Sequence, residues 1–298
     1  MQHATWNAIE SSPVAMSVYR SYRRLMPSSA RALLRWLAMP RWNAAAALVR
    51  HRAADTVLSG PFRGMHLNLA PVSSRNLLGY LLGTQEIELH DVVRRVIARG
   101  YPRIINVGAA DGYYAIGFLR QMPRTKVTAF EGALEHHAGL LRAAVLNSVA
   151  GRFTLRGFCH PDDLGAELAE LPGPTLVLAD IEGGELDMLD LIKVPRLSCA
   201  DILVETHDAF VPDCTEKLKA RFSGTHNVEQ IVARPRSLAD FPAAIIPELS
   251  KFMPRTAVEL MNERRTGTQM WLYLTAKRQP EVEAVGVVEK SNLDRGSL

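Results

Sequence analysis

The regular alternation of β-forming runs and amphipathic stretches after Gly100 is the feature that most constrains the fold of this chain. Seven runs rich in β-forming residues are expected to be strands, at 103–107, 126–131, 152–158, 175–180, 201–205, 227–233 and 269–275. Helical patterns lie between them at 113–121, 134–148, 162–171, 185–192 and 214–223. Such alternation predicts a doubly wound, seven-stranded, mostly parallel α/β sheet, whose ligand lies beyond the carboxyl ends of the strands.

The remaining chain divides into flanking segments. Residues 1–79 are expected to form an N-terminal helical, Arg-rich extension with a small hairpin at 56–69, and residues 80–278 the main domain. Within that domain, the irregular, proline-containing segment 234–267 is expected to be a lid-like insertion or to pack on the sheet edge. Residues 279–298 read as a polar tail.

Charge is distributed unevenly between these parts. The first 52 residues hold eight arginines against the single acid Glu10, which gives +7, so the remaining 246 residues carry −3 of the formal +4. The basic prefix is interpreted as a cap or homodimer element, as a peripheral membrane contact, or as a segment without either role. Nucleic-acid binding is not expected, because the chain lacks aromatic platforms and a known nucleic-acid module.

Three scattered cysteines and the lack of a secretory signal pattern lead us to expect a reducing, cytoplasmic location. No transmembrane segment is expected, since Arg35 and Arg41 interrupt the apolar stretch 32–49.

The turn after the first strand predicts a cofactor site. Gly108 allows close approach of a ligand to the backbone, and Gly112 lets the chain turn into the next helix. The spacing is G-x-x-x-G with Asp111 inside it, whereas a dinucleotide site favours G-x-G-x-x-G. Because a carboxylate would repel a pyrophosphate, the loop favours a cofactor that presents a cation or hydroxyls.

Glu131 follows the second strand, where it can accept hydrogen bonds from a ribose diol or instead cap a helix.

The sequence resembles the class I S-adenosylmethionine-dependent methyltransferases, and within them the FkbM-like family, at 106–114, Glu131, 180–185 and 205–207. The resemblance covers roughly residues 80–275 and implies a Rossmann-like fold. It implies that Gly108, Ala109 and Gly112 line the methionine and ribose part of the cofactor, that Glu131 holds the ribose, and that Glu86 reaches the amino group. The family usually has Asp where this chain has Asn106. The other cofactor-binding candidates are Asn106, Asp111, Tyr113, Gly132, Phe158 and Asp180.

Acidic residues and a histidine follow the fourth and fifth strands, so we expect Asp180, Glu205 and His207 to converge beside the cofactor. In one mechanism His207 is the general base, oriented by Glu205 or Asp208; in another, Asp180 and Glu205 bind Mg²⁺, which acidifies an acceptor hydroxyl. These side chains could also be purely structural. For Glu182 and Glu185 the helix dipole is a sufficient explanation.

The resemblance implies O-methylation of a hydroxyl on a small molecule, such as a sugar or natural-product scaffold. N-methylation and a non-catalytic, cofactor-binding partner subunit remain alternatives.

Phe158 is expected near the adenine. Three arginines of the insertion, Arg234, Arg236 and Arg255, could recognise an anionic or sugar-rich acceptor or form a solvated loop. His136 and His137, in mid-helix, are expected on the surface.

Overall fold

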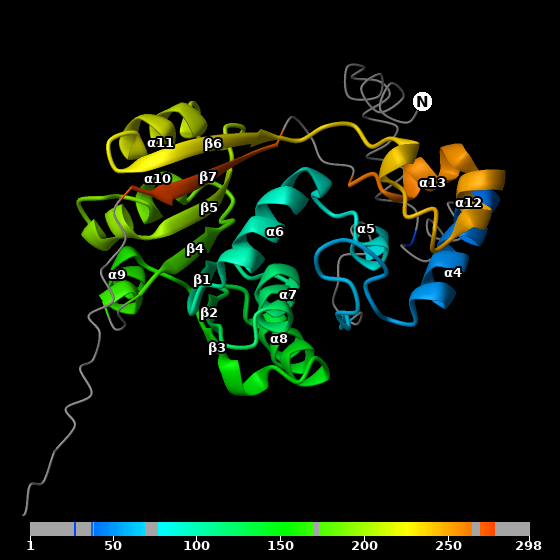
Figure 1. The fold of residues 1–298 in the computed structure, drawn as a ribbon, viewed down its shortest axis with the longest axis horizontal. Coiled ribbons are helices and arrows are strands. Elements are labelled where there is room, and N and C mark those ends of the chain that lie inside the picture. Colours follow the sequence, from blue (N-terminus) through cyan, green and yellow to red (C-terminus); the bar gives the residue numbers. More distant parts are fainter. Residues whose placement is uncertain are drawn as a thin grey trace, which may run out of the picture.

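The computed structural model describes residues 27, 37, 39–68, 77–169, 173–263 and 269–277, and its centre is one seven-stranded sheet (Figure 1). The strand order is β3-β2-β1-β4-β5-β7-β6, and β7 runs antiparallel to both of its neighbours. The strands are β1 (Arg103–Val107), β2 (Lys126–Phe130), β3 (Phe153–Arg156), β4 (Thr175–Ala179), β5 (Asp201–Thr206), β6 (His226–Val232) and β7 (Met270–Ala276). Each begins and ends within two residues of its expected range, which confirms the predicted fold class.

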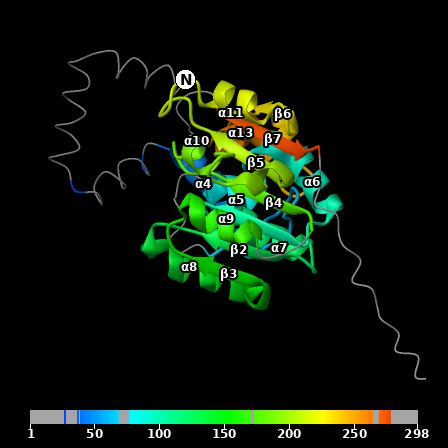
Figure 2. The same cartoon turned by 90° about the vertical axis from the view of Figure 1, so that its left-hand side faces the viewer.

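Helices cover both faces of the sheet (Figure 1, Figure 2). On one face, Ile104 and Leu178 pack in a core with α6 (His90–Arg99), α7 (Tyr113–Gln121) and α8 (Leu134–Leu146). On the other face, Ile105 and Val177 pack with α9 (Pro161–Ala169), α10 (Glu185–Met188) and α11 (Cys214–Phe222). Since successive strand residues point to opposite faces and helices cover both, β1, β4 and β5 are buried at every position.

A third core joins segments that are far apart in the sequence. Helices α4 (Pro40–Ala53) and α5 (Leu77–Leu82) pack with α12 (Pro247–Phe252) and α13 (Pro254–Leu260) of the insertion. Figure 1 shows α4, α12 and α13 grouped beyond the sheet. The expectation of an irregular 234–267 segment was therefore wrong at 238–240, 247–252 and 254–260, which are helical. Pro247 and Pro254 begin helices rather than break them, because a first-turn proline loses no helical hydrogen bond.

The remaining short elements are an isolated β-bridge and four 3₁₀ turns spread along the described chain. The expected hairpin is present as one antiparallel bridge between Thr56 and His66. Three 3₁₀ turns, η1 (Ile87–Leu89), η2 (Ala150–Arg152) and η3 (Pro195–Cys199), precede α6, β3 and β5, and η4 (Leu238–Asp240) begins the insertion. Residues 1–26, 28–36, 38 and 69–76 of the predicted N-terminal extension and the predicted tail 279–298 lie outside the described residues. Among the described helices, none is long and apolar enough to cross a membrane.

A buried ion cluster attaches the insertion to the main domain. Arg236 donates to Glu88 at 2.6 Å and also to Glu263, and all three side chains are less than one-tenth exposed. Glu263 additionally accepts the backbone N–H of Glu86 at 2.8 Å. The pKa of Arg236 is affected most by burial, which lowers it, but the two carboxylates outweigh that effect and raise it. The insertion is thereby fixed beside the segment that carries Glu86.

We predict that R236A lowers the free energy of unfolding by about 3 kcal/mol, because Glu88 and Glu263 would remain buried without their guanidinium. R255A is the matched control: Arg255 is exposed on α13, and its removal should change stability by less than about 0.5 kcal/mol. Denaturant unfolding measures both variants. Equal stability of the two proteins would contradict a stabilising role for the cluster.

Candidate active site

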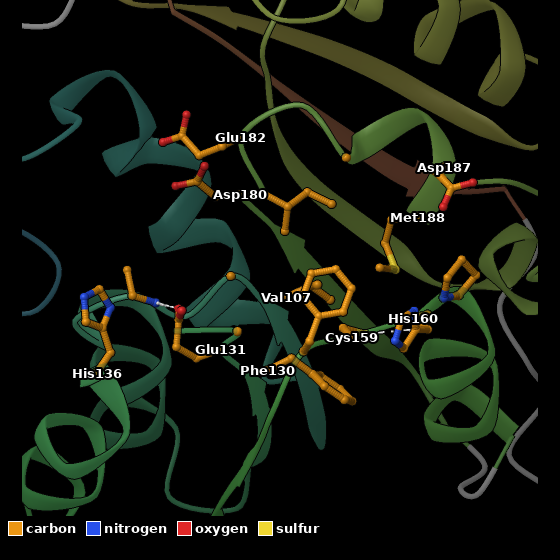
Figure 3. Close-up of a pocket in the computed structure, with 17 residues that line it drawn as sticks. Val107, Phe130, Glu131, His136, Cys159, His160, Asp180, Glu182, Asp187 and Met188 are labelled. Carbon is orange, nitrogen blue, oxygen red and sulfur yellow. Dashed lines mark hydrogen bonds between the residues drawn. The ribbon is translucent and has the colours of Figure 1, made fainter. Parts of the chain in front are cut away.

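A cavity of about 410 Å³ opens at the carboxyl ends of β1, β2 and β4. Strands β1 and β4 are neighbours whose connections leave toward opposite faces, so the loops separate here and leave a crevice. Figure 3 shows the lining side chains arranged around it. The cavity is lined by Val107, Gly108, Ala110, Phe130, Glu131, Gly132, His136, Phe158, Cys159, His160, Pro161, Asp180, Ile181, Glu182, Gly184, Asp187 and Met188.

Gly108 forms the floor of the cavity, and no other residue fits there. Its φ is +79°, and a Cβ at this position would lie 1.9 Å from the backbone oxygen of Asp180. The N–H groups of Gly108 and Ala109 both donate to the Phe130 carbonyl at 3.0 Å, which ties the turn to β2. The predicted glycine turn therefore brings the ends of β1, β2 and β4 into contact.

Glu131 is held with its carboxylate in a fixed orientation. One oxygen accepts the Ala110 N–H at 2.7 Å (Figure 3). The other oxygen accepts the Ala133 N–H at 2.8 Å. An ionised carboxylate has about four acceptor positions, so both oxygens keep capacity for a ligand in the cavity. The predicted role of Glu131 as an acceptor for ligand hydroxyls is compatible with this geometry.

The opposite wall of the cavity is largely apolar. The Phe158 side chain is 70% exposed, and its ring lies over Gly132, where a Cβ would approach it to 3.1 Å. Phe130 and Met188 contribute further apolar surface.

His136 also lines the cavity, so its expected surface role was wrong: the first turn of α8 follows Glu131 directly and turns this ring inward. His137 is only partly buried and contacts the Glu131 carbonyl at 2.7 Å.

Several residues predicted to bind the cofactor lie behind the cavity lining. Asn106 is buried, and its side-chain amide donates to the Gly108 carbonyl at 3.4 Å, so it stabilises the glycine turn without lining the cavity. Gly112 has a φ of +82° at the start of α7, with Leu140 behind it. Burial raises the pKa of Asp111, with Glu131 adding to the effect and His136 opposing it. The Tyr113 ring stacks on Tyr80 in the core, 4.6 Å between centroids, so its side chain is not part of the lining.

Glu86 is buried beside Tyr114, a residue that the sequence did not single out. The Tyr114 hydroxyl donates to the Glu86 carboxylate, and the Glu86 backbone has a φ of +45°. This strained conformation is held by Glu263 of the insertion through the Glu86 N–H. The position of Glu86 therefore depends on a segment almost 180 residues away in the chain.

His207 lies among four carboxylates. Its Nδ1 is 2.5 Å from Glu185 Oε1. Its Nε2 lies 3.5 Å from Glu182, 3.7 Å from Asp180 and 4.0 Å from Glu205. Burial alone would lower the pKa of His207, but the hydrogen bond and charge of Glu185, with the charges of Asp180 and Glu182, raise it above its ordinary value. The predicted convergence of Asp180, Glu205 and His207 is confirmed.

Glu185, rather than Glu205 or Asp208, orients the imidazole. Its side chain is fully buried, and it accepts from His207 Nδ1 and from the Gly183 N–H at 3.0 Å. Burial would raise the pKa of Glu185, but the hydrogen bond from His207 lowers it below its usual range. Asp208 instead accepts from the backbone N–H and hydroxyl of Thr215 at the start of α11. The helix dipole offered a sufficient reason for an acid at 185, and no local pattern indicated a partner 22 residues away.

Phe210 is a second residue that sequence reasoning missed. Its side chain is 63% exposed, and its ring lies at 25° to the His207 ring with 5.8 Å between centroids. A turn in which Phe210 N–H and Val211 N–H both donate to the His207 carbonyl holds the ring there. An exposed aromatic ring beside a buried histidine offers an apolar surface to a molecule that approaches Nε2.

The Mg²⁺ site predicted from the sequence comprised Asp180 and Glu205, and in the structure His207 lies with them. Asp180, Glu205 and His207 each offer one ligand atom, and these atoms lie within 4.8 Å of one another. One of the three is an imidazole, whereas Mg²⁺ favours an all-oxygen octahedron. The donor set does not fit Mg²⁺, and no step below passes through a metal ion.

No family model and no curated protein matches the chain. Among solved structures, it matches the O-methyltransferase TomG of Streptomyces achromogenes in complex with S-adenosylmethionine, at 14% identity over 68% of this chain and 81% of TomG, with a TM-score of 0.40. It also matches an O-methyltransferase of Bacillus cereus in complex with S-adenosylhomocysteine, at 12% identity over 70% and 93% of the two chains, with a TM-score of 0.44. Likenesses of this size assign no activity, so the function below rests on the geometry of the site.

We predict that G108A destabilises the protein by at least about 2 kcal/mol, because the added Cβ would collide with Asp180 and occupy an unfavourable φ. G165A is the control: Gly165 lies inside α9 with nothing within 4 Å, so alanine there should stabilise by up to about 1 kcal/mol. Thermal unfolding measures both. If G165A lost stability and G108A did not, the conclusion that only glycine fits at position 108 would be refuted.

Proposed function

We propose that this protein is an S-adenosylmethionine-dependent methyltransferase. The observation that carries the proposal is the cavity at the switch point of the sheet, lined by the oriented carboxylate of Glu131 and by Asp180 and Glu182. The last two carboxylates also lie 3.7 Å and 3.5 Å from Nε2 of His207, which pairs with Glu185. When bound, S-adenosylmethionine supplies an electrophilic methyl group on a cationic sulfonium. Glu131 accepts hydrogen bonds from its ribose diol, and the apolar wall at Phe158 packs against its adenine. The negative charges of Asp180 and Glu182 attract its positive charge.

The cavity supports this cofactor rather than a dinucleotide. Its volume of about 410 Å³ lies within the range of small-ligand sites. The acids Glu131, Asp180, Glu182 and Asp187 all line it. A pyrophosphate would be repelled by such a lining, whereas a cation and a diol would be stabilised.

In the proposed mechanism, His207 Nε2 removes the proton of an acceptor hydroxyl. Glu185 holds Nδ1 at 2.5 Å, which fixes the ring orientation and stabilises the imidazolium that results. Asp180 and Glu182 increase the basicity of the ring through their negative charge. The four surrounding carboxylates also make this position unfavourable for an anionic group on the acceptor.

The acceptor is proposed to be a small, uncharged hydroxylated molecule, such as a sugar or natural-product scaffold. Arg234 pairs with Asp240, and Arg236 pairs with Glu88 and Glu263, which argues against recognition of an anionic acceptor by these two arginines. Phe210 offers an apolar face to a ring of the acceptor. Membership of the FkbM-like family and a cytoplasmic location, compatible with three free cysteines, belong to the same proposal.

Two alternatives make different predictions for His207. An amine acceptor needs less help from a base, so a methyltransferase acting on nitrogen should tolerate H207A. A non-catalytic cofactor-binding subunit would bind S-adenosylmethionine but transfer no methyl group. For the proposed O-methyltransferase, H207A should reduce kcat about 100-fold while cofactor binding is unchanged.

Calorimetry tests the cofactor assignment. S-adenosylmethionine and S-adenosylhomocysteine should both bind, and E131A should weaken both at least about tenfold because the ribose hydroxyls lose their acceptor. E216A is the control, since Glu216 is 70% exposed on α11 and lies outside the cavity lining. Failure of the wild-type protein to bind either compound would refute the proposed function.

The pH dependence tests the base. Because the pKa of His207 is raised, its neutral, proton-accepting form is available only above that raised value, so turnover should fall as the pH decreases through a pKa above 6.5. E185Q removes the main stabilising charge and should shift this pKa downward, whereas the more exposed Glu182 makes E182Q a control with a smaller shift. Ring titration by NMR measures the pKa without an acceptor. A His207 pKa that is unchanged in E185Q would overturn the assignment of Glu185.

A further inference from the structure

Helix α8 carries an apolar stripe on the face opposite the core. Leu140, Ala143 and Ala144 point inward and are buried. On the outer face, the exposed fractions are 73% for Leu134, 51% for Leu141 and 66% for Val145. Exposed Ala138 completes the stripe, whose four members are Leu134, Ala138, Leu141 and Val145.

The spacing of the stripe is that of a helix-pairing seam. Steps of four, three and four residues keep the four side chains within an arc of about 60° on an α-helix. The same steps are the d-a-d-a positions of a heptad pattern. Single exposed apolar residues are ordinary on protein surfaces, whereas a continuous apolar row marks a contact surface. In both views α8 lies at the periphery of the molecule, where another chain can reach it (Figure 1, Figure 2).

Charges beside the stripe indicate what occupies it. Glu135 and Arg142 are exposed on the same flank of the helix, and neither forms an ion pair with any residue that the structure describes. In an antiparallel pair related by a twofold axis, each flank faces the same flank of the other helix. Glu135 then lies opposite Arg142 of the partner subunit, and the contact occurs twice. A parallel pair would place this flank opposite His137 and Ala144 of the partner subunit, which offer no such match.

We propose that two copies of this chain associate through antiparallel pairing of their α8 helices. Leu134 packs near Val145 of the partner subunit, and the small Ala138 accommodates Leu141 of the partner subunit. Burial of both apolar rows supplies the affinity, and the paired charges select the antiparallel register. This inference is independent of the proposed enzymatic activity.

Sedimentation equilibrium of the full chain, from about 1 to about 100 µM, tests the proposal. The wild-type protein should form a dimer, and L141E should raise the dissociation constant at least about 100-fold, because a carboxylate would enter the apolar seam. I192E is the matched control: Ile192 is 90% exposed outside α8, so this variant should dimerise like the wild type. Circular dichroism checks that both variants are folded. A wild-type protein that stays monomeric, or an L141E dimer of unchanged affinity, overturns the proposal.

Charge exchange tests the antiparallel register. E135R and R142E should each weaken the dimer about tenfold by placing like charges opposite one another. The double variant E135R/R142E should return to within about threefold of the wild-type affinity, because the exchanged charges again match across the twofold axis. A double variant weaker than either single one would contradict this register, and dissociation caused by I192E would locate the interface elsewhere.

Discussion

The contact between the ends of β1 and β4 is the constraint on which the rest of this structure depends. The two strands pair in parallel from Arg103 with Thr175 to Val107 with Ala179, and the Asp180 N–H continues the pairing by donating to the Val107 carbonyl at 3.1 Å. Only a residue without a Cβ can follow Val107, because the Asp180 carbonyl occupies that space. Gly108 thus sets how closely the two strand ends approach, and their loops form opposite walls of one cavity.

Charge is the second organising feature of the site. The carboxylates of Asp180, Glu182, Glu185 and Glu205 surround His207. Asp180 and Glu182 also line the cavity, together with Glu131 and Asp187. Burial would ordinarily penalise such a group of ions. Hydrogen bonds from Ala110, Ala133 and Gly183 N–H groups offset part of that penalty and fix the acids in place. A site of this kind is prepared for a cation and for proton removal, which are the two requirements of the proposed methyl transfer.

The insertion links the third core to the site through polar contacts. Its helices pack with α4 and α5, and its Glu263 holds the backbone of Glu86 in a strained conformation while Arg236 joins Glu263 to Glu88. The segment expected as a lid-like insertion or as packing on the sheet edge is folded in part into helices, and Glu263 fixes it beside Glu86. Helix α8, which carries the proposed dimer contact, follows β2 in the chain and lies away from the insertion helices α12 and α13 (Figure 1).

The sequence by itself determined the sheet, its strand boundaries and the positions of Gly108, Glu131, Asp180 and His207, because local patterns of burial, glycine and acid placement encode these features. Only the tertiary structure assigned Glu185 to His207, turned Tyr113 into the core, placed Tyr114 against Glu86 and converted the proline-containing insertion into helices. These outcomes depend on which distant side chain fills a given space or satisfies a given buried charge. A fully buried carboxylate such as Glu185 needs a partner, but its identity is set by packing of β5 against α10 and not by any local spacing.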